Sequence, residues 1–233
     1  MRAMRLTPDL VARCFRPVPE PEQPPEGWTP LDETALAARA AELDAEAGAG
    51  PLWVFAYGSL IWKPVFAPIE TRRAVAAGWR RSFCIELTSW RGTPDAPGLM
   101  MALEPGGSCA GLAHRLDPAR RLSDLVELVR RETPYLELAQ NVRWIQARAE
   151  GERLRALAFY ARPIGIPVAR NLSPPETAAR LAQACGYAGS CAEYLYNTVL
   201  HLEAEGIRDR VLWRLQALVA EEIARWTAPE PQA

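Results

Sequence analysis

An apolar run at residues 52–57 ends abruptly at the small pair Gly58-Ser59. The run is rich in aromatic and β-branched residues and is too short for a typical helix, so it predicts a strand that is covered on both faces. Gly58 lets a ligand approach the backbone N–H groups of the following turn, and Ser59 adds a hydroxyl. The turn is therefore suited to a small polar or anionic group, although Gly58-Ser59 also fits a turn that only ends the strand.

Short apolar runs separated by turn residues continue through the middle of the chain. They occur at 74–79, 82–88, 99–103, 110–116, 142–149 and 154–161. Several short strands at this spacing favour a compact barrel or a strongly curved sheet. With the helices described next, the pattern indicates the α+β class with a helical C-terminal third. The choice between a barrel and a curved sheet stays open at this point; the small β-barrel with flanking helices is what the resemblance given below implies.

The N-terminal segment combines a proline-rich arm with one helix. Residues 1–30 hold a cluster of prolines, which lack the N–H that helices require, so this arm is expected to wrap rather than fold alone. The alanine-rich run 34–47 predicts a helix that is capped near Asp32 and ended by Gly48 and Gly50.

A second helix is predicted inside the series of strands. Asp117 is suited to cap it, and Pro118 to occupy its first turn. Its apolar stripe comprises Leu122, Leu125, Val126 and Val129. The helix is expected to end at 130–133, because Pro134 follows.

Three helices are predicted in the last third. A capping box at 173–176 opens a helix that is expected to stop at Gly186, and a second box at 190–193 opens one that is expected to stop at Gly206. The final helix is predicted at about 207–226. Its buried side is expected to carry Val211, Leu212, Leu215, Leu218, Val219 and Ile223.

Length and composition are those of an ordinary soluble protein. The 233 residues favour one domain with an appended part, so we expect an arm and helix at 1–50 and the main domain at 51–233. The formal net charge of −1 provides no global field for nucleic acid or an anionic membrane, so neither is an expected partner. The chain shows no signal-peptide pattern or membrane-length apolar run, which favours the cytoplasm.

Histidine and cysteine spacing argues against a metal site and a serine triad. The five cysteines include no paired C-x-x-C spacing, and we expect reduced, mostly structural thiols. The two histidines, His114 on a strand and His201 on a helix, have no carboxylate or cysteine at ligand spacing. The G-x-S-x-G elbow of a serine hydrolase is missing too. We therefore expect no metal and no cofactor.

Glu132 is the carboxylate with the most unusual setting. It lies where a helix ends, after two arginines and before Pro134, so its side chain can leave the helix axis. Burial there would raise its pKa towards the range that suits proton transfer, while the adjacent arginines would oppose that shift. The alternative is a solvated glutamate in a charged cluster.

Arg91 belongs to a rigid loop that also holds two glycines and two prolines, at residues 90–98. Its guanidinium is suited to pair with a ligand carboxylate. It is equally suited to anchor the loop to the rest of the protein.

These residues together resemble the ChaC-type gamma-glutamylcyclotransferases. The segment 57–64, Tyr-Gly-Ser-Leu-Ile-Trp-Lys-Pro, resembles the signature loop of that family, and Arg-Gly-Thr-Pro at 91–94 resembles its second motif. Arg131-Glu132 is similar to the segment that bears the family's catalytic glutamate. Segments near both ends, at 10–14, 191–195 and 207–209, are similar to bacterial members, so the resemblance covers almost the whole chain.

The resemblance implies a small barrel enzyme that converts glutathione to 5-oxoproline and cysteinylglycine without a metal or coenzyme. It implies that Glu132 transfers the protons. It also implies that Tyr57, Gly58, Ser59, Leu60 and Arg91 bind the substrate, with N–H groups of the loop holding the gamma-glutamyl group. The substrate carries its own nucleophile, because its α-amine can close a five-membered ring on the γ-carbonyl.

One segment departs from the family. Many relatives carry a tyrosine in an asparagine-rich loop where this chain reads Pro-Ile-Gly-Ile-Pro-Val-Ala-Arg-Asn at 163–171. Two alternatives stay open, a cyclotransferase for other gamma-glutamyl amino acids or amines, and a non-catalytic module that senses a gamma-glutamyl compound. Retention of Glu132 together with Gly58 and Ser59 favours the enzyme, because binding alone needs no proton-transfer group. The oligomeric state has no signal in the sequence.

Overall fold

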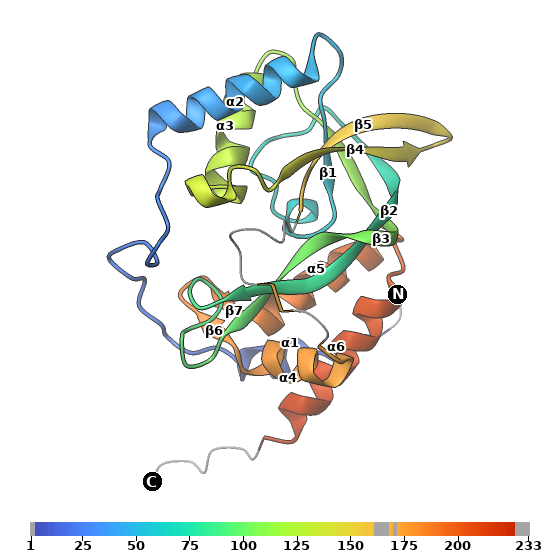
Figure 1. Cartoon of the computed structure of the whole chain (residues 1–233). Helices are drawn as coiled ribbons and strands as arrows, with labels where there is room; N and C mark the ends of the chain where they lie inside the picture. The colour runs from blue at the N-terminus through green and yellow to red at the C-terminus, as the bar shows by residue number, and fades with distance from the viewer. Residues whose placement is uncertain (1–2, 161–167, 170–171, 227–233) are drawn as a thin grey trace. The chain divides into compact units, whose positions relative to one another are not determined.

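The computed structural model describes residues 3–160, 168–169 and 172–226 (Figure 1). The described residues form two compact units. The barrel unit comprises those within 21–85 and 101–168, and the helical unit those within 1–20, 86–100 and 169–233.

Five strands close into a barrel in the order β1-β3-β2-β4-β5. The strands are β1 (Trp53–Ala56), β2 (Glu70–Leu87), β3 (Gly98–Arg115), β4 (Val142–Ala149) and β5 (Glu152–Phe159). The pairs β1–β3, β2–β4 and β4–β5 run antiparallel, and β1 pairs in parallel with β5. The α+β class is confirmed, and of the two arrangements that the strand spacing favours, the structure forms the closed barrel.

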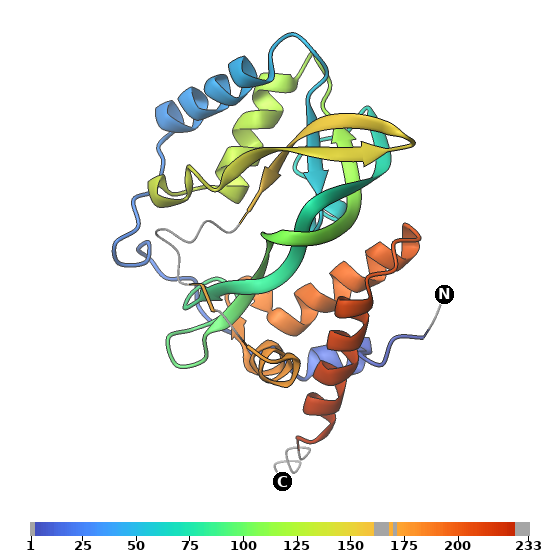
Figure 2. The same ribbon diagram turned by 45° about the vertical axis from the view of Figure 1, so that its right-hand side comes forward.

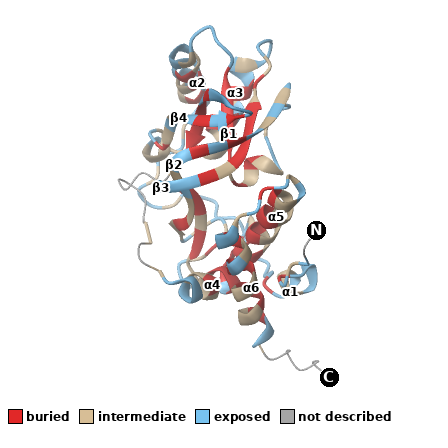
Figure 3. Cartoon of the chain, turned by 90° about the vertical axis from the view of Figure 1, so that its right-hand side faces the viewer, coloured by how far each residue is buried: buried red, intermediate tan, exposed pale blue. Residues whose placement is uncertain are grey.

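Both faces of β1 are buried, as the apolar run at 52–57 predicts (Figure 3). Trp53 and Phe55 join a core cluster that also draws residues from β2 to β5. Val54 and Ala56, on the other face, are fully buried as well. The strand is therefore held firmly up to the residue where the Tyr57-Gly58 turn begins.

The two long strands β2 and β3 were expected to be broken, and this is wrong. The predicted pairs 74–79 with 82–88, and 99–103 with 110–116, each fall within one continuous strand. The turn residues in the second gap, Gly106 and Gly107, adopt φ values of 103° and 75° inside β3. A bend of this kind changes the direction of a strand without ending its pairing.

Helices α2 (Glu33–Ala47) and α3 (Arg121–Glu132) lie side by side in the barrel unit (Figures 1 and 2). The caps predicted for α2 are confirmed, since the Asp32 carboxylate accepts from the Ala35 N–H at 2.8 Å. At the other end of α2, Gly48 is the C-cap residue.

The predicted start of α3 is wrong, and its predicted end is right. The Asp117 carboxylate accepts from the Ala119 N–H in a turn, and the helix begins only at Arg121. As a result Leu122 is exposed instead of lying on the apolar stripe. The buried residues of α3 are Asp124, Leu125, Leu128 and Val129. A short 3-10 turn, η2 (Leu136–Leu138), follows.

The helical unit holds the C-terminal helices and a short N-terminal one. Its elements are α1 (Pro8–Ala12), α4 (Pro174–Gln183), β6 (Cys185–Gly186), β7 (Gly189–Ser190), α5 (Cys191–Ala204) and α6 (Arg210–Ala224). The helix α1 was not expected in the proline-rich arm. It begins with a side-chain cap from Thr7, to which the Leu10 N–H donates, and with Pro8 in its first turn.

Helix starts in this unit agree better with the sequence than helix ends. The capping box at 173–176 is complete at α4, but the helix ends at Gln183, because Gly186 pairs with Gly189 in a two-stranded ladder. The final helix α6 begins at Arg210, capped by Asp209, and not near Ile207. Val211 is therefore 70% exposed, contrary to the expected buried stripe.

All five cysteines are buried and carry free thiols, as expected. Among the described residues, no helix combines the length and the apolar character that crossing a membrane requires.

Candidate active site

The loop after β1 is a tight 3-10 turn, η1 (Ser59–Ile61), with Gly58 as its N-cap residue. The Ile61 N–H donates to the Gly58 carbonyl at 3.0 Å, and the Lys63 N–H donates to the Ser59 carbonyl at 2.7 Å. The first amides of such a turn have no acceptor within it. Gly58 is buried at φ −136°, outside the left-handed region, so any requirement for glycine here concerns space.

Strand contacts fix the start of this turn. Gly111 of β3 lies so close to β1 that a Cβ there would come within 2.4 Å of the Ala56 carbonyl oxygen. Arg81 of β2 donates through Nε to the Tyr57 carbonyl at 2.7 Å. The Tyr57 hydroxyl donates to the Phe159 carbonyl at the end of β5, also at 2.7 Å. Strands β2 and β5 therefore hold Tyr57, and β3 lies against Ala56 beside it.

Leu60 contributes to the core rather than presenting its side chain, which is buried. Close to its backbone lies His114 of β3, whose Nδ1 atom is 2.9 Å from the Thr71 hydroxyl oxygen. Burial lowers the pKa of His114, with the Leu60 backbone opposing the change, so the imidazole is neutral at pH 7. Only the backbone of Leu60 is thus suited to face a ligand.

Glu132 is the last residue of α3, as the sequence predicts. The chain leaves the helix at Thr133, a buried residue whose hydroxyl and N–H both donate to the Val129 carbonyl. Because Pro134 disfavours helical geometry in the residue before it, the helix has no means to continue.

Arg131 connects Glu132 to the loop. Its Nη2 atom donates to the Ser59 hydroxyl oxygen at 2.8 Å, and Nη1 donates to the Lys63 carbonyl. Its Nε atom lies 3.3 Å from Oε1 of Glu132. Two predicted site residues, Ser59 and Glu132, are therefore brought together by a third whose contact with the loop was not foreseen. The one signal that pointed to it is its place beside Glu132.

The Glu132 carboxyl holds its proton more tightly in this site than it would in water. Burial raises the pKa of Glu132, and the charge of Arg131 opposes the change. The side chain nevertheless keeps 21% of its surface exposed. A carboxyl with a raised pKa that solvent still reaches is suited both to accept a proton and to return it.

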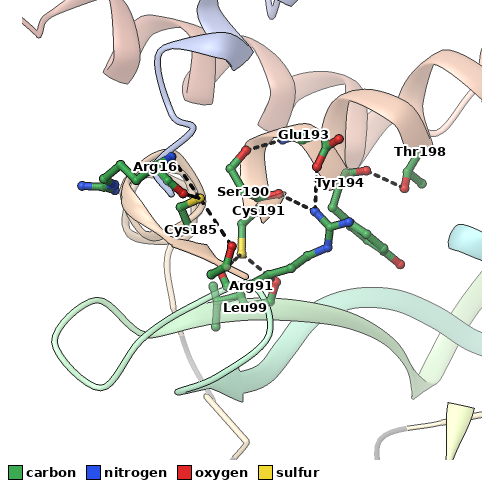
Figure 4. Close-up of polar contacts among 10 residues, drawn as sticks. Arg16, Arg91, Leu99, Cys185, Ser190, Cys191, Glu193, Tyr194 and Thr198 are labelled. Carbon is green, nitrogen blue, oxygen red and sulfur yellow. Dashed lines mark hydrogen bonds and ion pairs between the residues drawn. The ribbon is translucent and has the colours of Figure 1, made fainter. Parts of the chain in front are cut away.

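Arg91 lies in the helical unit, where protein groups hold its guanidinium (Figure 4). Nη1 donates to the Ser190 carbonyl at 2.8 Å and to Glu193 at 3.0 Å, and the guanidinium carbon lies 5.5 Å from the centre of the Tyr194 ring. The Cys191 thiol donates to the Arg91 carbonyl at 3.2 Å. These contacts are those of a loop anchor, and a role of Arg91 in binding a ligand stays a prediction.

The same contacts explain why the second predicted capping box is only half formed. The Ser190 hydroxyl accepts from the Glu193 N–H at 3.1 Å, as expected. The Glu193 carboxylate, however, pairs with Arg91. Glu193 therefore forms an ion pair with the largely buried guanidinium instead of the weaker hydrogen bond from the Ser190 backbone N–H.

Two further predictions concern metals and the divergent loop. Among the described residues, no group of three or more histidine, cysteine, aspartate or glutamate side chains is arranged to hold a metal ion. Of the segment 163–171 that was compared with the tyrosine-bearing loop, only Val168 and Ala169 are described, and the other residues lie outside the described ranges.

Comparison with known proteins gives one consistent family. Residues 52–222 match the family described as ChaC-like protein. The glutathione-specific gamma-glutamylcyclotransferase of Escherichia coli (strain K12) is 33% identical over 181 residues, which cover 76% of this chain and 76% of that protein. The human glutathione-specific gamma-glutamylcyclotransferase 1 is 32% identical over 148 residues, covering 62% of this chain and 66% of the relative.

A solved structure supports the fold independently. The crystal structure of a yeast gamma-glutamyl cyclotransferase specific to glutathione superposes with a TM-score of 0.64 at 21% identity. The match covers 74% of this chain and 96% of the yeast chain. At this identity the likeness concerns the fold alone, and it agrees with the closed barrel described above.

Proposed function

This chain belongs to the ChaC-like family, and we propose that it cleaves glutathione to 5-oxoproline and cysteinylglycine. The observation that carries the proposal is the contact network of Arg131, which joins Ser59 of the loop to the Glu132 carboxyl. A loop suited to bind the gamma-glutamyl group and a group suited to move protons thereby share one site in the barrel unit.

The reaction needs no external reactant. The α-amine nitrogen of the gamma-glutamyl group attacks the γ-carbonyl carbon, a C–N bond forms within the new five-membered ring, and the amide bond to the cysteinyl nitrogen breaks. Glu132 takes the proton from the α-ammonium group, which frees the attacking electron pair. It returns this proton to the departing nitrogen. The ring nitrogen releases a second proton as the lactam forms, and the departing amine takes up one from solvent, so protons balance and Glu132 ends as it began.

The loop binds the gamma-glutamyl end of the substrate. The amides at the start of η1 provide N–H donors for a carboxylate or for the charge that develops on the amide oxygen. Because the Ser59 oxygen accepts from Arg131, its own O–H remains available as a donor to the substrate. Tyr57 acts through its place in the loop, since its hydroxyl donates to Phe159.

The test is incubation of the purified chain with glutathione, followed by mass detection of 5-oxoproline and cysteinylglycine. Equal formation of both products supports the proposal, and their absence with folded protein refutes it. Gamma-glutamyl-alanine and gamma-glutamyl-methylamide serve as parallel substrates. Faster turnover of either would move the assignment to the wider class of gamma-glutamyl amino acids or amines. Binding of glutathione without turnover would favour a sensing module.

The proposed reaction also bears on the compartment of the enzyme and on its cofactor requirement. Glutathione is an intracellular thiol, and the five free thiols of this chain suit a reducing compartment, so we assign it to the cytoplasm. Proton transfer by Glu132 requires neither a metal nor a coenzyme.

A further inference from the structure

We propose that Arg131 is a positioning residue that holds the turn at 58–63 and the Glu132 carboxyl in one fixed geometry. This inference rests on the proposed function and deepens it. Arg131 contacts both the loop and Glu132. It does not itself transfer a proton in the proposed reaction.

The side chain of Arg131 contacts three groups of the site, two through hydrogen bonds and one through an ion pair. The guanidinium of Arg131 reaches the Ser59 hydroxyl, the Lys63 carbonyl and the Glu132 carboxyl from Nη2, Nη1 and Nε in turn. The planar guanidinium places these donors in a rigid fork, whereas a lysine ammonium is a single charged point on a flexible stem. One rigid group thus holds the two hydrogen-bonded oxygens and the paired Glu132 carboxyl relative to one another.

Arg131 also closes the turn at both ends. Within the turn, the Lys63 N–H already donates to the Ser59 carbonyl at 2.7 Å. Arg131 adds the Ser59 side chain and the Lys63 carbonyl to this closure. The amides between them therefore keep their direction when no substrate is bound, which lowers the cost of ordering on binding.

Arg131 and Glu132 are neighbours in the sequence, and their side chains also contact each other. Residues one position apart on an α-helix project in different directions and do not normally meet. Arg131 and Glu132 meet at 3.3 Å because both lie in the last turn of α3 and the guanidinium folds back towards the carboxyl. The exposed fractions of the two side chains, 20% and 21%, show that solvent screens this contact only partly.

The charges around Glu132 make the effect of Arg131 measurable. On α3, Arg130 faces away and pairs with Glu33 of α2 at 2.5 Å and with Glu127 at 3.4 Å. From the loop, the group that completes the network is the uncharged Ser59 hydroxyl. Among the described residues, Arg131 is the charged group that acts on the pKa of Glu132. Removal of Arg131 should therefore raise that pKa further.

The test titrates the Glu132 carboxyl by carbon-13 NMR in protein labelled at glutamate, with the signal assigned by its loss in Glu132→Gln. In Arg131→Met we expect the pKa to rise by about one unit or more, the usual effect of removing an adjacent opposite charge. The acid limb of the kcat/KM profile should move to higher pH by the same amount. The control Arg130→Met, which loses only an exposed pairing, should titrate like the wild type.

Two further variants separate charge from geometry and cover the case in which Arg131→Met does not fold. Arg131→Lys keeps the charge but not the fork, so its Glu132 pKa should shift by less than half as much, while KM for glutathione rises severalfold. Ser59→Ala should raise KM without moving the acid limb. An unchanged Glu132 pKa in Arg131→Met, or a wild-type KM in Arg131→Lys, would overturn the proposal.

The NMR titration distinguishes failure of this inference from failure of the proposed function. It needs no substrate, and the amide resonances of 58–63 report the position of the turn in the same samples. If the chain did not cleave glutathione, the shifts in Arg131→Met and Arg131→Lys would still decide whether Arg131 positions the two groups.

Discussion

The Nη2 atom of Arg131 lies 2.8 Å from the hydroxyl oxygen of Ser59, although the two residues are 72 positions apart in the chain. Ser59 follows the first strand of the barrel, whereas Arg131 lies in the last turn of α3. The contact joins the signature-like loop to the segment that bears Glu132. It therefore unites the two parts of the chain that the proposed chemistry needs.

Substitution of Glu132 is the most direct test of its role. Glu132→Gln keeps the size of the side chain but cannot accept the α-ammonium proton, so the protein should bind glutathione and fail to cyclise it. We expect kcat to fall by about 10²- to 10⁴-fold, the usual contribution of a general acid or base. Glu127→Gln is the control, since Glu127 pairs with Arg130 on the exposed face of the same helix. A dead Glu127→Gln, or an active Glu132→Gln, would show that the role is misassigned.

The raised pKa of Glu132 also predicts an effect on stability. The folded state binds the Glu132 proton more tightly than the unfolded state does. The protonated carboxyl therefore adds to the free energy of unfolding at low pH, and this stability is lost as the pH rises through the folded-state pKa. The Glu132→Gln variant loses no stability in this way, because glutamine does not titrate. The Tm difference between Glu132→Gln and wild type should therefore grow in favour of the variant as the pH rises above the ordinary glutamate pKa of 4.5. Thermal unfolding at several pH values checks this, and a difference that shrinks over the range would contradict a raised pKa.

Gly58→Ala tests the loop. Gly58 is buried at the start of η1, and a Cβ there is expected to crowd either the turn or the gamma-glutamyl group. We expect KM for glutathione to rise at least severalfold with the protein still folded. Steady-state kinetics beside a thermal melt provide the measurement. Unchanged KM and kcat would mean that Gly58-Ser59 only ends the strand.

Gly111→Ala tests how β3 supports the same turn. A Cβ would lie 2.4 Å from the Ala56 carbonyl oxygen and 3.0 Å from the Phe55 ring, so two strands must move apart. Forcing extra atoms into a packed core typically costs about 1–3 kcal/mol. We expect a lower Tm together with a higher KM. The matched control is Gly50→Ala, where a Cβ meets no atom within 4 Å, and equal melting of the two variants would refute the close approach.

Activity should persist in a chelator. The chain contains only His114 and His201 as histidines, and His114 is buried with its Nδ1 on Thr71, so neither offers a ligand set. Dialysis against EDTA should leave turnover of glutathione unchanged. Loss of turnover that one divalent ion restores would require a metal-dependent mechanism instead.

Local signals in the sequence predicted the elements whose determinants lie within a few residues. The Asp32 cap and the 173–176 capping box form between residues three apart, so the local sequence is enough to specify them. The buried strand at β1 follows equally from its own apolar run. Glu132 could be singled out for a similar reason, since both the helix end and Pro134 adjoin it.

Long-range contacts determined the rest. Gly106 and Gly107 read as a break, but pairing with neighbouring strands continues β3 through them. Arg91 finds its partners 99 and 102 positions away, on residues that no local pattern connects with it. The Ser59 and Arg131 contact has the same origin. The neighbours of a residue in the sequence determine only its local conformation. Its hydrogen-bond partner depends on which strands and helices the folded barrel and the packed helices bring close to it.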